Sequence, residues 1–131
     1  MFKNLISKKY SIQASETYFH VTEKKNLKSI LSKGLVPQIG PLSQKLGEDR
    51  KAVYLFATEL EMENALANWL GEEFEEMAEE RGVDEVPCVA LKVMLPDGFV
   101  EKQFDTSGNE FFEAVCLKPI PPQYIKFFKD C

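Results

Sequence analysis

The stretch YFHVTEKKNLKSILSKGL, residues 18–35, contains the only histidine of the chain. Its first four residues are typical of a short strand, and a segment with the spacing of one helix face follows. The apolar positions of that segment are Leu27, Ile30, Leu31 and Leu35. Gly34 stands where a left-handed C-cap is favoured, and Pro37 prevents the helix from continuing. The stretch therefore predicts a strand followed by a short helix, with His20 at the strand's end.

A loop, a strand and a longer helix are expected next. Residues 36–51 hold two prolines, two glycines and mixed charge, and a loop of that length in a compact domain is more often functional than idle. Residues 52–58 (AVYLFAT) are apolar without alternation, which predicts a central strand buried on both faces. Thr58 and Glu61 form a capping-box pattern, so we expect a helix that begins there and ends at Gly82. The glutamates in its second half are interpreted as a solvated face.

The remainder of the chain is rich in strand patterns. Residues 88–95 alternate apolar side chains on one face, and strands are also predicted over 99–104, over 110–118 and within 119–128. Because the helices come early and the strands late, the sequence predicts an α+β fold. A length of 131 residues fits one domain, 1–131, with a single hydrophobic core.

Charge and composition exclude several function classes. The net charge is −5 and the chain has two arginines, Arg50 and Arg81. Non-specific nucleic-acid binding depends on Lys and Arg that neutralise phosphates, so this chain is a poor candidate for it. No apolar run has the length of a signal peptide's core or of a membrane span. We therefore expect a cytoplasmic protein that does not enter a membrane.

The cysteines do not form a metal-binding pattern. Cys88, Cys116 and Cys131 are odd in number, contain no CxxC pair and are accompanied by one histidine. The expectation is three buried, reduced thiols and no metal site.

Three polar residues lie on strands that otherwise read as buried: His20, Tyr54 and Glu113. A buried glutamate is rare unless it is paired or functional. Each residue also has an ordinary interpretation. His20 could be a hydrogen-bonded structural histidine, Tyr54 a core aromatic, and Glu113 a side chain that faces water from an edge strand.

The order of three sequence blocks favours a functional reading. The blocks HVTEKKNLKSILSKGL, VYLFATELEMENALANW and EAVCLKPIPPQYI together resemble the ADP-ribosyltransferase superfamily. The likeness is to its His-Tyr-Glu branch, which includes poly(ADP-ribose) polymerases and diphtheria-type toxins, and it covers residues 18–125. It implies two packed, antiparallel-rich sheets that form an NAD cleft with two helices. It also implies a glycosyltransferase that cleaves nicotinamide from NAD, its co-substrate, without a metal, and passes ADP-ribose to a protein or nucleic-acid acceptor.

The resemblance assigns a role to each motif residue. His20 would hydrogen-bond a ribose of NAD with support from Thr22, and Tyr54 would offer its π-face to the nicotinamide. Glu113 would be the catalytic carboxylate, because breaking the glycosidic bond builds oxocarbenium character that a preorganised negative charge stabilises. Glu110 is a rival for this role, although strand alternation should turn it to the opposite face.

The loop at 36–51 corresponds in position to the family's donor loop. Its polar residues could meet the pyrophosphate of NAD, since isolated cations and a hydroxyl suit one small anion. These residues are Ser43, Lys45, Arg50 and Lys51. Val21 departs from the family, where polymerases have a small glycine, and the resemblance therefore implies a different contact with the nicotinamide amide.

Three alternatives remain open from the sequence. The chain could be a catalytically inactive NAD- or ADP-ribose-binding or protein-interaction module of the same fold. It could be an RNA 2'-phosphotransferase-like enzyme, although that activity relies on a set of arginines and this chain has two. It could also be a structural α+β domain whose motif residues serve only packing.

Overall fold

The computed structural model describes residues 16–38, 51–104 and 110–131, with side chains for all of these except 102–104 and 110–113. The strands are β2 (Glu16–Glu23), β3 (Val53–Phe56), β4 (Cys88–Leu95), β5 (Val100–Phe104), β6 (Glu110–Cys116) and β7 (Ile125–Asp130). The α-helices are α1 (Leu27–Lys33), α3 (Glu59–Ala67) and α4 (Trp69–Arg81), and the short 3-10 helices are η1 (Lys24–Asn26) and η2 (Pro122–Tyr124). The fold is α+β, as predicted.

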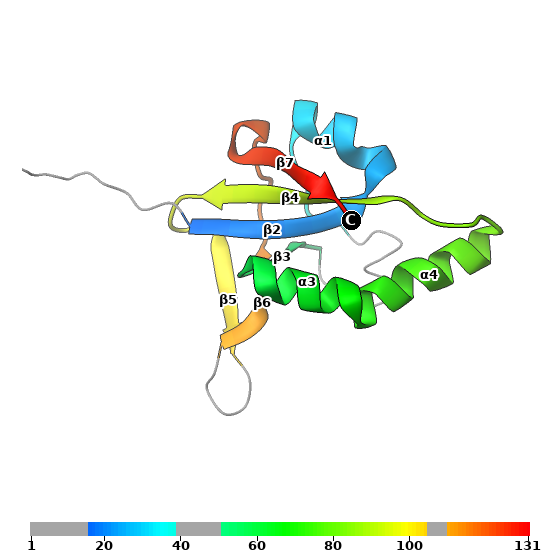
Figure 1. The fold of residues 1–131 in the computed structure, drawn as a ribbon. Coiled ribbons are helices and arrows are strands. Elements are labelled where there is room, and N and C mark those ends of the chain that lie inside the picture. The colour runs from blue at the N-terminus through cyan, green and yellow to red at the C-terminus, as the bar shows by residue number, and fades with distance from the viewer. Residues whose placement is uncertain (1–15, 39–50, 105–109) are drawn as a thin grey trace, which may run out of the picture.

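The six described strands form one antiparallel sheet in the order β5-β6-β3-β2-β4-β7. The prediction of two packed sheets is wrong for these strands. The physical reason is that β3 pairs with β6 on one side and with β2, at Phe56 and Phe19, on the other, which joins all six strands in one sheet. The sheet carries α1 on one face and α3 with α4 on the other (Figure 1).

Each face of the sheet has its own apolar cluster. The alternating residues of β4 predicted to share a face do so: Val89, Leu91, Val93 and Leu95 are almost fully buried in the cluster on the α1 side. Ala90, between them, belongs to the cluster under α3 and α4. The central strand β3 contributes Leu55 to the first cluster and Phe56 to the second, which confirms that it is buried from both faces.

The predicted helix from Thr58 to Gly82 is broken into two. Its first cap is confirmed, since the Glu61 N–H donates to Oγ1 of Thr58 at 3.1 Å. Asn68, however, leaves the helical conformation at φ −129° and ψ −112°, and its side chain donates to the carbonyl of Asn64 at 2.8 Å. In a continuous helix the carbonyl of Asn64 would accept from the backbone N–H of Asn68. Here the side chain of Asn68 donates to that carbonyl instead, so the helix can end at this point. The break lets both pieces bury their apolar faces against the sheet.

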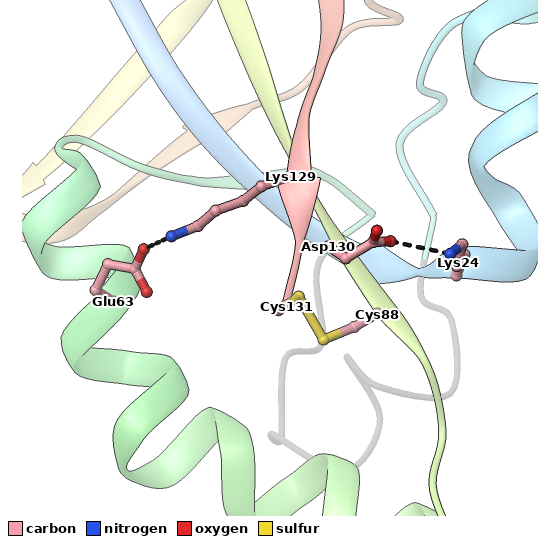
Figure 2. Close-up of a disulfide and its surroundings, with 6 residues drawn as sticks. All are labelled: Lys24, Glu63, Cys88, Lys129, Asp130 and Cys131. Carbon is pink, nitrogen blue, oxygen red and sulfur yellow. Dashed lines mark hydrogen bonds and ion pairs between the residues drawn. A yellow bond between two sulfur atoms is a disulfide. The ribbon is translucent and has the colours of Figure 1, made fainter.

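A disulfide joins Cys88 and Cys131 (Figure 2). The expectation of reduced, buried thiols is therefore wrong for this pair, and it is right for Cys116, which is free and buried. The antiparallel course of β7 brings Cys131 back to the start of β4, where its N–H donates to the Cys88 carbonyl at 3.0 Å. The Cα atoms are 5.4 Å apart, within the range a disulfide can span. A cross-link at a sequence separation of 43 stabilises the folded state by about 4 kcal/mol in the loop-entropy account.

Among the helices that the structure describes, none has the length and apolar character needed to cross a membrane.

Candidate functional site

The strands that carry the three motif residues are neighbours. Glu113 is on β6, Tyr54 on β3 and His20 on β2, and these strands are consecutive in the sheet. Phe56 is the shared reference point, because it pairs with Phe19 on β2 and with Glu113 on β6. Adjacent strands lie about 4.8 Å apart. The paired residues Phe19, Phe56 and Glu113 therefore span about 10 Å across the three strands. His20 is one residue from Phe19 along its strand, and Tyr54 is two residues from Phe56.

The His20 imidazole is anchored to β3. Its Nδ1 lies 2.9 Å from the carbonyl oxygen of Tyr54. A carbonyl oxygen only accepts, so Nδ1 carries the hydrogen, and in the neutral ring Nε2 is left as an acceptor. Burial lowers the pKa of His20 below its ordinary value, and the hydrogen bond to Tyr54 opposes this in part. The ring is therefore neutral at pH 7, and Nε2 can receive a hydroxyl hydrogen.

The hydrogen bond from His20 replaces a ladder contact between β2 and β3. These strands share one paired position, Phe19 with Phe56, whereas β2 and β4 are paired along the whole length of β2. In a continued antiparallel register Val21 would stand opposite Tyr54, whose carbonyl instead accepts from the imidazole. The regular β2–β3 ladder thus ends at His20.

The structure joins His20 to the backbone of Tyr54 and not to its ring. By strand alternation His20 lies on the same face of the sheet as Tyr18, the face covered by α1. Tyr54 lies on the same face as Phe56, the opposite face, which α3 and α4 cover. The Tyr54 side chain is half-buried and belongs to neither of the clusters that the described residues form. A ligand that contacts both rings must therefore reach them where the β2–β3 ladder ends.

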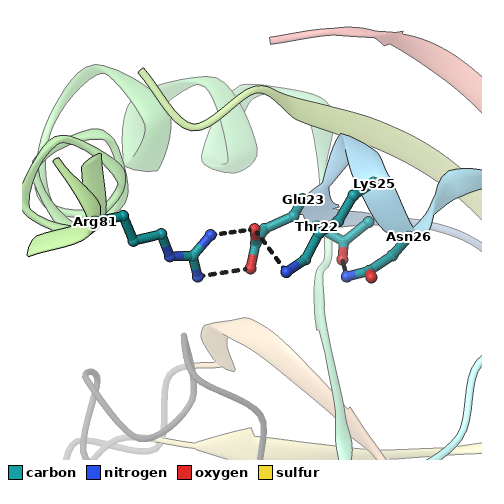
Figure 3. Close-up of polar contacts among 5 residues, drawn as sticks. All are labelled: Thr22, Glu23, Lys25, Asn26 and Arg81. Atoms are coloured by element: carbon teal, nitrogen blue, oxygen red, sulfur yellow. Dashed lines mark hydrogen bonds and ion pairs between the residues drawn. The ribbon is translucent and has the colours of Figure 1, made fainter. Parts of the chain in front are cut away.

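Thr22 is occupied by a local contact. Nδ2 of Asn26 donates to Oγ1 of Thr22 at 3.3 Å, across the turn between β2 and α1 (Figure 3). The hydroxyl of Thr22 is half-buried and still has its own hydrogen to donate.

The remaining predicted site residues are described only in part. Ser43, Lys45 and Arg50 lie outside the described residues, and Lys51 is exposed just before β3. For Glu113 the structure gives the backbone register alone. That register excludes one ordinary reading, since β6 lies between β5 and β3 and is not an edge strand. Within the described part of the chain, no group of three or more His, Cys, Asp or Glu side chains could hold a metal ion.

An ion pair between a buried glutamate and an exposed arginine lies next to the site and was missed from the sequence. Glu23, at the end of β2, is 8% exposed, and both of its oxygens accept from Arg81 at the end of α4, at 2.7 and 3.1 Å (Figure 3). Nζ of Lys25 is 3.8 Å from the same carboxylate. The signal was present, because Glu23 follows Phe19 and Val21 in the alternation and so falls on an apolar face. The pair fixes the end of the His20 strand to α4.

We expect Glu23→Gln to cost about 1–3 kcal/mol of stability at pH 7, the range for breaking a hydrogen bond to a charged group. The Arg81 hydrogen bonds lower the pKa of Glu23 from 4.5 and outweigh the opposing effect of burial. A lowered carboxyl pKa stabilises the folded protein above the unfolded pKa, and this contribution is lost as the pH falls below about 4.5.

Urea unfolding of the two proteins at pH 7 and pH 3.5 measures this effect. The difference between wild type and Glu23→Gln should shrink at the lower pH. Glu79→Gln, which removes an exposed carboxylate from the same end of α4, should change stability by a few tenths of a kcal/mol at most. Equal effects of the two substitutions would show that the ion pair contributes nothing.

Neither the protein-family models nor the curated proteins contain a match to this chain.

Proposed function

We propose that this protein is an NAD-dependent ADP-ribosyltransferase, which breaks the bond between nicotinamide and ribose in NAD and transfers ADP-ribose to an acceptor. The observation that supports this best is the adjacency of β6, β3 and β2, which carry Glu113, Tyr54 and His20. The hydrogen bond between His20 and the Tyr54 carbonyl adds to it, since it links the first two motif positions across 34 residues of sequence.

His20 would bind a ribose hydroxyl of NAD. Its Nδ1 hydrogen is committed to Tyr54, so the tautomer that results leaves Nε2 as an acceptor for an O–H donor. Its lowered pKa keeps that nitrogen unprotonated at neutral pH. Thr22, two residues further along the strand, would add a second polar contact with its remaining hydroxyl hydrogen.

Tyr54 would stack on the nicotinamide ring. Tyr54 is half-buried on a central strand, so part of its side chain is accessible to a ligand. Aromatic stacking adds about 0.5–1.5 kcal/mol to the burial of the two surfaces. Ser43 and Arg50 would meet the pyrophosphate, as the family resemblance implies.

Glu113 would act on the reacting centre. As the glycosidic bond breaks, the electron pair leaves with nicotinamide and positive charge develops on the ribose, which a fixed carboxylate stabilises. The acceptor, a nucleophilic group of a protein or nucleic acid, then attacks the ribose carbon and gives up a proton, which Glu113 can take.

Binding of NAD is expected to raise the melting temperature, because a ligand that binds only the folded state stabilises it by mass action. At a concentration of 100 Kd the gain is about 2.7 kcal/mol, or several degrees for a chain of this size. His20→Ala should abolish the shift while the unliganded variant still melts cooperatively. Differential scanning fluorimetry with and without NAD measures both quantities.

Two results would contradict the proposal, and a third would make the protein an NAD-binding module instead of an enzyme. A shift that persists in His20→Ala removes His20 from the binding site, and a variant that is unfolded without NAD makes His20 a structural residue. If NAD binds but incubation with labelled NAD and cell lysate gives neither free nicotinamide nor labelled product, the inactive binding module is the better description.

A further inference from the structure

Strand β7 is divided by an irregularity into two parts. Up to Phe127 it pairs regularly with β4, Ile125 opposite Val93 and Phe127 opposite Leu91. The register then shifts between Ala90 and Leu91, so that Phe128 is the extra residue and Lys129 stands opposite Ala90. A bulge of this kind bends a strand and interrupts its ladder. Residues 128–131 therefore form a segment that can separate from β4 without disturbing the first part.

The two parts are held by contacts of different kinds. Ile125, in the first part, is 5% exposed within the cluster on the α1 side. In the second part the Phe128 ring packs on Phe19 at 5.5 Å between centroids. Phe128 also packs against the cluster under α3 and α4, and Nζ of Lys92 lies 4.9 Å from the centre of its ring. Further contacts of this part are the backbone pairs of Lys129 and Asp130 with β4, the ion pairs Lys129–Glu63 and Asp130–Lys24, and the disulfide (Figure 2).

The disulfide is the decisive contact among these. The side chains of Lys24 and Asp130 are 54% and 61% exposed, and exposed ion pairs contribute little. Among the described strands, β7 lies at the edge of the sheet and pairs only with β4, and strand ends at an edge are the parts of a sheet that open most easily. A covalent bond from Cys131 to the first residue of β4 prevents that opening.

We propose that Cys88–Cys131 is a thiol-exchange site for a dithiol reductant, and that reduction releases residues 128–131 from β4 while the rest of the sheet stays folded. This does not depend on the proposed function. Cys131 is exposed, whereas Cys88 is partly buried, so the reductant reaches Cys131 first. Cys116 is fully buried and takes no part.

The exchange follows the ordinary course of such reactions. A thiolate of the reductant attacks Sγ of Cys131, the disulfide bond breaks, and Cys88 leaves as a thiolate. The second thiol of the reductant then displaces Cys131 from the mixed disulfide. The protein gains two electrons and two protons, and the reductant becomes a disulfide.

Release uncovers the outer edge of β4 at Val89 and Ala90, both of which are fully buried in the closed form. A newly unpaired strand edge can accept another strand. The redox state of the two cysteines thus controls whether this edge is available.

Hydrogen exchange in the air-oxidised and the dithiothreitol-reduced protein tests the proposal. Amides of residues 129–131 should exchange at least about tenfold faster after reduction, which corresponds to about 1.4 kcal/mol of opening free energy. Amides in the hydrogen bonds between β2 and β4 should remain protected in the reduced protein, because the sheet stays folded. Cys131→Ser should behave like the reduced protein with or without dithiothreitol, and Lys24→Ala, which removes only the exposed ion pair, should change exchange much less.

Three outcomes would overturn the proposal. If peptide mapping without reductant finds both thiols free, the site does not exist. Equal exchange at 129–131 in the two redox states would show that reduction does not release the segment. Loss of protection throughout the sheet on reduction would make the bond a support for the whole fold.

Discussion

Replacing Glu113 by glutamine is expected to lower nicotinamide release from NAD by about 10²–10³-fold and to leave NAD affinity nearly unchanged. Glutamine keeps the shape and most of the hydrogen bonding but removes the negative charge. An interaction that matters mainly in the transition state lowers turnover without a matching loss of substrate binding. Single-turnover rates of nicotinamide release and NAD titrations measure the two parts separately.

Glu110→Gln is the matched control, since it makes the same change on the same strand three residues earlier. It should have far less effect, because strand alternation gives the two positions opposite faces. Equal activity in wild type and both variants would remove Glu113 from catalysis and favour a binding module. A large loss in Glu110→Gln with little in Glu113→Gln would exchange their roles.

Gly34→Ala is expected to cost about 3 kcal/mol of stability or more. Gly34 ends α1 with φ 88° and ψ −172°, a region that is essentially closed to residues with a Cβ. An alanine Cβ there would lie 2.2 Å from the carbonyl oxygen of Ile120, which is backbone and cannot rotate away. That carbonyl accepts from Leu35 at 3.0 Å, and the Ile120 N–H donates to Leu35 at 2.8 Å. The substitution therefore disturbs both the end of α1 and the bridge beside it.

Gly82→Ala separates the two causes. Gly82 ends α4 with φ 68°, and an added Cβ would meet nothing within 4 Å, so this variant should lose only about 1–2 kcal/mol for the left-handed backbone. Urea midpoints for the two variants and wild type provide the comparison. If Gly34→Ala loses no more than Gly82→Ala, the close approach to Ile120 does not contribute.

The Gly34-Leu35 step also connects the sequence motif to the structure. Gly34 and Leu35 end the first of the three sequence blocks, and Leu35 is hydrogen-bonded to Ile120 within the third block. The bridge between Leu35 and Ile120 joins segments far apart in the sequence. The Gly-Leu pair could therefore be recognised from the sequence, but the contact that requires it could not.

The sequence by itself determined the features that depend on neighbouring residues. The cap at Thr58, the helix ends at Gly34 and Gly82, and the buried face of β4 were all predicted and are confirmed. The left-handed helical conformation predicted at Gly34 is wrong, because Gly34 has ψ −172° and turns the chain toward Ile120. Capping, left-handed glycine and strand alternation act over a few residues, so a short window contains the whole physical cause.

Tertiary structure decided everything that joins distant segments. One sheet instead of two, the Cys88–Cys131 bond, the Glu23–Arg81 pair and the hydrogen bond from His20 to Tyr54 all depend on which strands are neighbours. The burial of Glu23 was missed, although strand alternation carried its signal; its partner, 58 residues away, has no signal in the alternation. Alternation places a side chain on a face, whereas pairing and register follow from how all the strands bury their apolar faces together. That collective choice has no local signature, and it is what puts Glu113, Tyr54 and His20 on adjacent strands.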